Sequence, residues 1–293
     1  MDERIFVDGH GVEVFTRSWP VDAPVGVVLV SHGASEHSGR YDRFARALND
    51  AGFAVAALDH RGHGRTGAAT GAGVMGVGGG QAVVDDLHQL RGEAEAAFPD
   101  TSVFLFGHSM GSLIGLAYLV QHGDGLAGSV LCGIPADVGD VAGVSDLLRA
   151  AEAAGLRDQP ADALVEANAP FEPARTAFDW LSRDEDEVDR YVADPLCGDG
   201  NPLTYGYLID LFDVLAPAGE LLHTIRSPVL VIAGDQDPAA AMGAHATTLA
   251  EALRAAGTPV DLHLYQGARH ELLNETNRDE VMADILDWLA MRR

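Results

Sequence analysis

Lysine is absent from this sequence of 293 residues, so all 19 basic side chains are arginine. Aspartate and glutamate number 44, and the formal net charge at pH 7 is -25. A surface of this sign repels the phosphate groups of nucleic acids and anionic lipids, so we expect no nucleic-acid partner. We interpret the acidic excess as a solvated surface, in keeping with adaptation to salt, rather than as a specific cation-binding site.

Cysteine and long apolar runs are also scarce. Cys132 and Cys197 could form at most one disulfide and lack the spacing of metal ligands, so we expect reduced thiols and no metal site. No apolar run approaches the ~20 residues that span a bilayer. Residues 1–4 lack the basic segment that opens a signal peptide. These absences predict a cytoplasmic protein that has at most transient contact with lipid surfaces.

Apolar runs alternate with helix-like patterns along most of the chain. A hairpin is predicted over residues 5–16. The predicted strands that follow it are residues 25–30, 53–58, 103–106, 129–132, 228–234 and 260–265. The predicted helices are residues 41–51, 82–98, 112–120, 244–256 and 279–291. This alternation is typical of βαβ units and predicts an α/β protein with a mostly parallel sheet.

The regular alternation is interrupted between residues 135 and 222. This part contains short helix-like pieces, including 144–154 and 205–215, separated by prolines and by acidic runs such as 184–187. We therefore divide the chain into a core of residues 1–134 and 223–293 and a helical cap of residues 135–222. Long insertions in α/β enzymes commonly form lids over the active site, and a surface insertion without such a role is the alternative.

Phosphate-binding and dinucleotide-binding motifs are also lacking. The glycine-rich tract 67–80 is predicted to be a loop, and its glycines at 71 to 80 lack the strand–turn–helix context of a phosphate-binding loop. A phosphate cradle requires that context, so no cofactor is expected.

A candidate nucleophile stands near the middle of the sequence. Residues 107–111 read Gly-His-Ser-Met-Gly, between the apolar run 103–106 and the helix-like run 112–120. G-x-S-x-G between a strand and a helix is typical of a nucleophile elbow, a sharp turn that holds its serine above the edge of a sheet. We therefore predict that Ser109 is a catalytic nucleophile, with a merely structural turn as the alternative.

A serine nucleophile needs a base, which is itself oriented by a carboxylate. In this fold the expected chain order is serine, acid, histidine. His270 follows the predicted strand 260–265 and is the predicted base. Asp235 and Asp237 both follow the strand 228–234. Asp237 is the preferred acid because it has more reach toward the histidine loop, and Asp235 is the alternative.

The tetrahedral intermediate of acyl transfer needs two preorganised N–H donors for its oxyanion. One is expected from the backbone of Met110, the residue after the nucleophile. The other is expected from Ala34, in the loop after the strand 25–30, with Ser35 as the alternative.

Four segments together resemble the monoacylglycerol lipase and lysophospholipase group of serine α/β-hydrolases. They are residues 32–41 (His-Gly-Ala-Ser-Glu-His-Ser-Gly-Arg-Tyr), 59–64 (Asp-His-Arg-Gly-His-Gly), 107–111 and 194–197 (Asp-Pro-Leu-Cys). The resemblance implies the α/β-hydrolase fold, with an eight-stranded, mostly parallel sheet, flanking helices and a helical cap. It also implies a triad of Ser109, Asp237 and His270 and an oxyanion hole at Ala34 and Met110.

The same resemblance bears on the substrate. Members of the group place the glutamate and arginine of the first segment near a polar head-group pocket, which implies a substrate-binding role for Glu36 and Arg40. A structural ion pair that holds the oxyanion loop is the alternative. Animal monoacylglycerol lipases carry a second histidine where this chain has Leu273. The predicted cap is also acidic and has no long apolar stretch of the kind that binds membranes. Both departures count more against a specific monoacylglycerol substrate than against ester hydrolysis.

The predicted function is therefore hydrolysis of a carboxylic ester through an acyl-enzyme, with a monoacylglycerol or a similar lipid ester as substrate. Neither a cofactor nor a protein partner is expected. The alternatives are a carboxylesterase or thioesterase for a small polar metabolite and a scaffold without catalytic activity. Serine at position 109 argues against dehalogenase and epoxide hydrolase chemistry, which needs an aspartate there.

Overall fold

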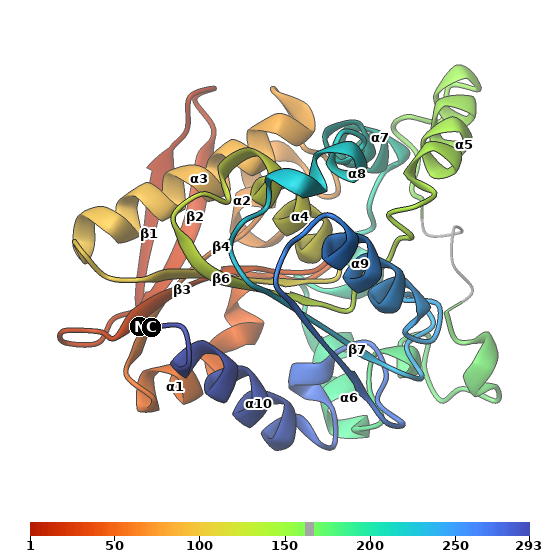
Figure 1. Cartoon of the computed structure of the whole chain (residues 1–293). Coiled ribbons are helices and arrows are strands. Elements are labelled where there is room, and N and C mark those ends of the chain that lie inside the picture. The colour runs from red at the N-terminus through yellow and green to blue at the C-terminus, as the bar shows by residue number, and fades with distance from the viewer. Residues whose placement is uncertain (162–166) are drawn as a thin grey trace.

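A computed structural model describes residues 1–161 and 167–293, and an eight-stranded sheet runs through its centre (Figure 1). The strands are β1 (Asp2–Val7), β2 (Glu13–Trp19), β3 (Gly26–Ser31), β4 (Phe53–Leu58), β5 (Val103–His108), β6 (Leu126–Cys132), β7 (Val229–Gly234) and β8 (Val260–Tyr265). Their order is β1-β2-β4-β3-β5-β6-β7-β8. β2 is antiparallel to both of its neighbours, whereas β3 to β8 pair in parallel. The mostly parallel sheet predicted from the sequence is confirmed.

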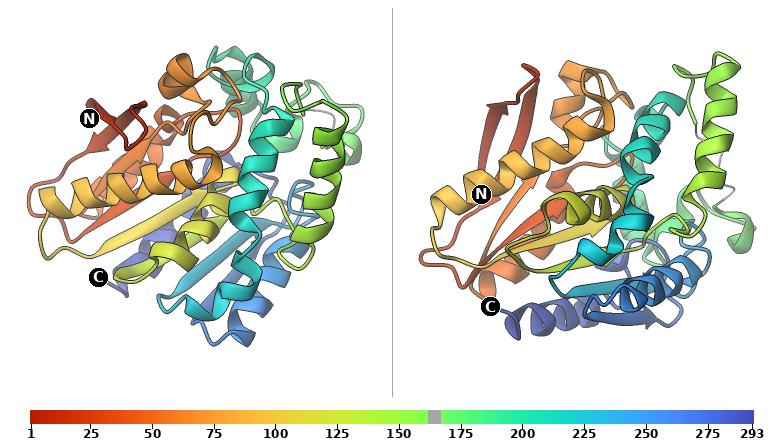
Figure 2. Two further views of the ribbon diagram at one scale, coloured as in Figure 1. Left: turned by 90° about the horizontal axis from the view of Figure 1, so that it is seen from above. Right: turned by 45° about the horizontal axis from the view of Figure 1, so that its top comes forward.

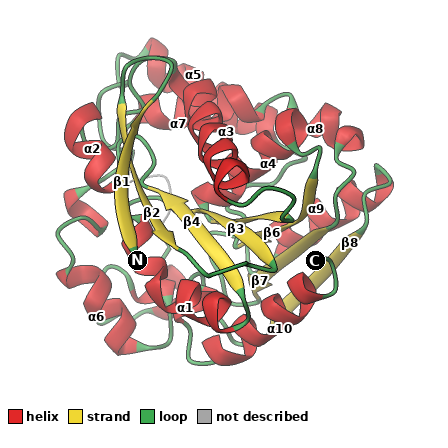
Figure 3. Cartoon of the chain, turned by 90° about the vertical axis from the view of Figure 1, so that its left-hand side faces the viewer, coloured by secondary structure: helices red, strands yellow, loops and turns green. Residues whose placement is uncertain are grey.

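Helices cover both faces of this sheet (Figure 3). On one face lie α1 (Asp42–Asp50) and α10 (Arg278–Ala290), and on the other lie α3 (Gly79–Ala97), α4 (Met110–His122) and α9 (Ala244–Ala255). Successive side chains of a strand point to opposite faces, so each central strand contributes side chains to the apolar core on both faces of the sheet. Val28 of β3 packs in the core beneath α1 and α10, and Val27 packs in the core beneath α3 and α4. Burial on both faces explains why these strands are continuous apolar runs in the sequence.

Between β6 and β7 the chain forms a group of helices that lie outside the two helix layers covering the sheet. They are α5 (Val141–Ala153), α6 (Glu185–Ala193), α7 (Tyr205–Leu215) and α8 (Ala218–Leu221). α7 packs against α3 and α4, and α5 packs on α7 (Figure 2). Both chain ends lie on the opposite side of the molecule from α5 (Figure 1). In the described residues no helix is both long and apolar enough to cross a lipid bilayer.

Two local predictions are wrong. The tract expected to be a loop from residue 67 begins inside a helix, α2 (Gly64–Thr70). This helix forms because Gly67 lets its backbone pack on Gly62, and the Thr70 hydroxyl accepts the Gly62 N–H at 2.8 Å.

The acidic run 184–187 was expected to separate helices, and it starts α6 instead. The side chain of Asp184 caps that helix by accepting the N–H groups of Asp186 and Glu187. Acidic residues in a first turn are favourable because the N-terminus of a helix carries a partial positive charge.

Candidate active site

Ser109 occupies the tight turn between β5 and α4. Its backbone has φ 52° and ψ -121°, which residues with a Cβ rarely adopt. A Cβ at Gly107 would overlap the carbonyl oxygen of Gly111, and a Cβ at Gly111 would overlap that of Ser31. The two glycines therefore permit a turn in which Ser109 stands at the N-terminus of α4.

Asp237 and His270 lie in the loops that follow β7 and β8. Nδ1 of His270 donates to Oδ2 of Asp237 at 2.8 Å. Oδ1 of Asp237 accepts the backbone N–H groups of Ala239 at 2.9 Å and Ala240 at 3.2 Å, which fixes the carboxylate. Both side chains are buried. Because the proton of the neutral imidazole is on Nδ1, Nε2 is left as the basic nitrogen.

Asp235, the alternative acid, makes different contacts. Its Oδ1 accepts the backbone N–H of Gly267 at 2.7 Å and so ties the loop after β7 to the loop after β8. The structure therefore brings Asp237, and not Asp235, to the imidazole of His270.

The surroundings of His270 set its basicity. Its ring lies 4.8 Å from that of His108 and 4.9 Å from that of Trp180, measured between centroids. Burial disfavours the imidazolium, but the charge and hydrogen bond of Asp237 outweigh burial and raise the pKa of His270 above 6.5. Burial and the neighbouring His270 lower the pKa of His108 to about 4, so His108 is neutral at pH 7.

Ser109 and His270 line the same cavity. Among the described residues, no hydrogen bond joins the Ser109 hydroxyl to the imidazole. Such bonds are often long in free enzymes and tighten in the complex with substrate.

The loop after β3 lies against the Ser109 turn. A Cβ added at Gly33 would stand 3.2 Å from the Cβ of Ser109. The next residue, Ala34, and Met110 at the start of α4 both line the cavity. Within the described part of the chain, neither of their backbone N–H groups is used in a hydrogen bond. The two amides are therefore free to donate to an oxyanion formed at Ser109.

Ser35, the alternative donor, is held by the segment 191–201. Its carbonyl oxygen accepts the hydroxyl of Tyr191 and the backbone N–H of Gly198, both at 3.0 Å. Its hydroxyl donates to the carbonyl of Asn201 at 2.8 Å. These bonds hold Ser35 at φ 53°, a left-handed conformation that costs free energy for a residue with a Cβ.

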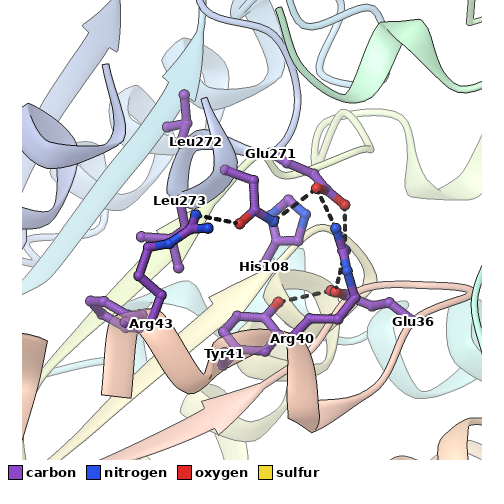
Figure 4. A pocket seen from close by; sticks show the side chains of 10 residues that line it. Glu36, Arg40, Tyr41, Arg43, His108, Glu271, Leu272 and Leu273 are labelled. Atoms are coloured by element: carbon purple, nitrogen blue, oxygen red, sulfur yellow. Dashed lines mark hydrogen bonds and ion pairs between the residues drawn. The ribbon is translucent and has the colours of Figure 1, made fainter. Parts of the chain in front are cut away.

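Glu36 and Arg40 belong to a buried network with Glu271 (Figure 4). Arg40 donates to Glu36 at 2.7 Å and to the two oxygens of Glu271 at 2.6 and 2.7 Å. Glu36 also accepts the backbone N–H of Gly33 at 2.5 Å and the hydroxyl of Tyr41 at 2.8 Å. These contacts tie the loop after β3, which holds Glu36 and Gly33, to Glu271 in the loop after β8.

Glu271 and Trp180 were missed from the sequence. Glu271 directly follows the predicted base, and that position is the signal by which it could have been found. Trp180 lies in the irregular part of the insertion, 90 residues before His270, and no pattern in the sequence places it against that ring.

The cavity beside Ser109 has a volume of about 830 Å³. Most of its apolar lining comes from the insertion between β6 and β7. The larger of these apolar residues are Val144, Leu147, Leu148, Phe178, Trp180, Leu181, Leu203, Leu208, Leu211 and Phe212.

One group of side chains has the composition of a metal site. Ligand atoms of His37, Asp194 and Cys197 lie within 4.8 Å of one another. Nδ1 of His37, however, accepts the backbone N–H of Gly39, so the ring proton is on Nε2 and is donated to Asp194 at 3.0 Å. A neutral ring in this tautomer has no free lone pair for a metal. The His37–Asp194 bond instead joins the insertion between β6 and β7 to the loop after β3.

Comparisons with known proteins agree with this geometry. A family model described as serine aminopeptidase, S33, matches residues 22–277. The chain is 31% identical to a monoacylglycerol lipase of Mycolicibacterium smegmatis, over 98% of this chain and 96% of the relative. It is also 31% identical to the monoglyceride lipase of Mus musculus, over 98% of this chain and 89% of that protein.

Solved structures show the same arrangement of elements. A thermostable carboxyl esterase from Bacillus coagulans, solved with glycerol, superposes with a TM-score of 0.89 and 31% identity, covering 99% of this chain and 98% of the esterase. A lipase solved in an open form superposes with a TM-score of 0.86 and 32% identity, covering 99% of each chain. On the extent of the family match, the sheet order and the placement of Ser109, Asp237 and His270, this chain belongs to the serine aminopeptidase S33 family of α/β-hydrolases.

Proposed function

We propose that this chain is a serine hydrolase that cleaves the carboxylic ester of a lipid, with a monoacylglycerol as the substrate that fits best. The observation that carries the proposal is the buried Asp237–His270 pair, which lies with the strained turn at Ser109 in the wall of a largely apolar cavity. The relatives named as monoacylglycerol lipases support the same chemistry.

In the proposed first half-reaction, Oγ of Ser109 attacks the ester carbonyl carbon while Nε2 of His270 takes the serine proton. The negative charge on the former carbonyl oxygen is stabilised by the backbone N–H groups of Ala34 and Met110. When the tetrahedral intermediate collapses, the bond from the acyl carbon to the alcohol oxygen breaks. His270 then gives its proton to the departing alcohol.

The second half-reaction regenerates the enzyme. A water molecule attacks the acyl carbon of the Ser109 ester while His270 takes a proton from the water. The bond to Oγ breaks, His270 returns the proton to Ser109, and the fatty acid leaves. Asp237 stays ionised throughout and holds the imidazole in the tautomer that each step requires. None of these steps calls for a metal or a cofactor.

The apolar cavity supports a substrate with a hydrocarbon chain. Each methylene that moves from water into such a lining contributes about 0.8 kcal/mol. A small polar metabolite would leave most of this surface wet, so the cavity favours a lipid ester over the carboxylesterase or thioesterase alternative. We propose that residues 135–222 act as the cap that forms this acyl pocket over the core of residues 1–134 and 223–293.

Glu36 and Arg40 have different proposed roles. Glu36 borders the cavity, and we assign it to the wall that faces the alcohol of the ester. Arg40 holds Glu36 and Glu271 in place through its three hydrogen bonds. The proposed partner is the lipid ester alone, and the cytoplasmic location expected from the sequence stays a prediction.

The proposal is tested with 1-monoacylglycerols and matched p-nitrophenyl esters from acetyl to palmitoyl, for the wild type and for Ser109→Ala. We expect a preference for medium or long monoacylglycerols and a loss of kcat of at least about a thousandfold in the variant. Activity restricted to short p-nitrophenyl esters would contradict the proposal of a lipid ester substrate, but not the proposed catalysis by Ser109.

Two further substrates separate the remaining alternatives. An acyl thioester tests for a thioesterase, and an amino-acid p-nitroanilide tests for the peptidase activity that the family description names. Turnover of either one in preference to every oxygen ester would overturn the proposal, as would a folded protein without any activity that depends on Ser109.

A further inference from the structure

The charged residues around the cavity are all acidic. Its lining carries five carboxylates and, among the described residues, no arginine: Glu36, Asp137, Asp140, Asp199 and Glu271. Residues 162–166 contain no basic residue in the sequence either. The only ionisable groups of the other kind in the described lining are the histidines at 108, 245 and 270. Glu36 and Glu271 are buried, whereas Asp140 and Asp199 are exposed to solvent. Water screens the two buried charges little, and walls of low dielectric focus the field of one sign into a cleft.

Arg40, which pairs with two of these carboxylates, is not part of the cavity lining. Arg40 borders a small pocket beside it, together with Tyr41 and Arg43 (Figure 4). Glu36 and Glu271 border both spaces. Two carboxylates are thus presented to the cavity, while the guanidinium that pairs with them lies behind. All the hydrogen bonds that Arg40 makes to side chains here go to these two residues.

The network carries a net negative charge. Burial disfavours the Glu36 carboxylate, but the charges of Arg40, His108 and His32 and the N–H of Gly33 outweigh burial and lower the pKa of Glu36 to about 2. Arg40 keeps its proton because the two carboxylates raise its pKa in spite of burial. One guanidinium therefore faces two carboxylates, and one negative charge is left uncompensated beside the reacting ester.

We propose that this acidic lining makes the enzyme selective for esters whose alcohol is uncharged, such as glycerol, and that it rejects esters whose alcohol carries a phosphate. The inference rests on the proposed ester hydrolysis at Ser109 and specifies its leaving group. A phosphate that enters the cavity would be repelled by the carboxylates of the lining. It would have no arginine to pair with, because Arg40 is already hydrogen-bonded to Glu36 and Glu271. Glu271 is the specificity-determining residue, because it accepts hydrogen bonds from Nη1 and Nη2 of Arg40 and lines the cavity.

The experiment compares three soluble esters that have the same acyl chain, each used below its critical micelle concentration. They are 1-octanoylglycerol, 1-octanoylglycerol 3-phosphate, and the dimethyl phosphate triester of the second. The triester is larger than the phosphate and uncharged, so it separates charge from size. The release of octanoate by the wild-type enzyme gives kcat/KM for each ester.

We expect kcat/KM for the phosphate ester to be lower than that for 1-octanoylglycerol by at least about tenfold. The uncharged triester should be cleaved within a few-fold of 1-octanoylglycerol. Cleavage of the phosphate ester with equal or higher kcat/KM would overturn the inference, and so would equal rejection of the phosphate and its triester.

Substitutions of the lining carboxylates test whether their charge causes the selectivity. In Glu271→Gln the ratio of kcat/KM between the neutral and the phosphate ester should fall several-fold, because one negative charge is removed and Arg40 is partly released. The double variant Asp140→Asn, Asp199→Asn removes two exposed charges of the lining without touching the buried network, and it should reduce the ratio less. Asp146→Asn is the matched control, since Asp146 is an exposed residue of α5 outside the lining. An unchanged ratio in both lining variants would contradict the proposal.

Failure of the inference can be distinguished from failure of the proposed function. If the neutral ester is cleaved through Ser109 and the phosphate ester is cleaved equally well, only the selectivity is wrong. If neither ester is cleaved by the folded protein, the proposed function fails, and the selectivity fails with it.

Discussion

At the scale of single residues, the site depends on neighbours that adjust one imidazole. His270 is buried, which by itself would lower its pKa, yet Asp237, Glu271 and Glu36 raise it above 6.5. A general base must be neutral to accept a proton, so in the proposed mechanism the pH at which His270 titrates sets the acid limit of activity.

The pH dependence of kcat/KM follows from this shift. Activity should rise with pH as His270 loses its second proton, and the midpoint of this acid limb should lie above 6.5. In Glu271→Gln the midpoint should move to lower pH, because a carboxylate that stabilises the imidazolium becomes neutral. Glu220→Gln, at an exposed position of α8, should leave the profile unchanged. A wild-type midpoint well below 6.5, or a midpoint that does not change in Glu271→Gln, would show that these carboxylates do not raise the pKa of His270.

At the scale of elements, the insertion between β6 and β7 supports the oxyanion loop as well as lining the cavity. The segment 191–201 binds Ser35 through three hydrogen bonds, and Asp194 binds His37. Ser35 directly follows Ala34, whose N–H is the proposed oxyanion donor. We therefore expect α6 and the residues after it to position that donor.

Tyr191→Phe tests this support. The variant loses one hydrogen bond to Ser35, and a net loss of about 1 kcal/mol in holding the loop would lower kcat roughly fivefold. KM should change little, because Tyr191 lines the cavity and phenylalanine keeps its ring there. Tyr265→Phe is the control, since it loses a comparable bond to Asp284 at 3.0 Å on α10. Equal losses of kcat in both variants, or an effect of Tyr191→Phe on KM alone, would show that Tyr191 has no positioning role.

The central strands could be predicted from the sequence because a strand that is buried on both faces has a continuous run of apolar residues. β5 and β7 are such runs, whereas β8 reads Val-Asp-Leu-His-Leu-Tyr and is only partly buried. The shared edge of the three strands brings Ser109, Asp237 and His270 to one cavity wall or its border. The choice between Asp235 and Asp237 depended on loop geometry, which a pattern of apolar residues does not encode. The packing of Trp180 and the pairing of Arg40 with Glu271 join residues far apart in sequence, and a single sequence carries no periodic signal for such contacts.

At the scale of the whole molecule, the charge balance is the dominant feature. The chain carries 44 acidic and 19 basic residues and no lysine. Some of the arginines form buried ion pairs. Nε of Arg61, for example, lies 2.8 Å from Oδ2 of Asp86. The remaining surface therefore bears an excess of negative charge, and its self-repulsion opposes the compact state.

Salt should stabilise the folded protein. Raising NaCl from about 0.1 to about 1 M shortens the screening length from about 10 to about 3 Å and weakens the repulsion between surface carboxylates. We expect Tm to rise by a few degrees, which corresponds to about 1–2 kcal/mol for a chain of this size. A neutral osmolyte at matched osmolality separates charge screening from exclusion of the solute. A Tm that stays flat or falls with NaCl would contradict this view of the surface.

Reaction of the protein with a fluorophosphonate, followed by mass spectrometry to locate the adduct, tests the assignment of Ser109 as the nucleophile. We expect a single adduct on Ser109, absent from Ser109→Ala and formed far more slowly in His270→Ala, with loss of ester hydrolysis in proportion to labelling. An unlabelled but folded and active protein, or an adduct on another residue that tracks the loss of activity, would contradict the assignment of Ser109, His270 and Asp237.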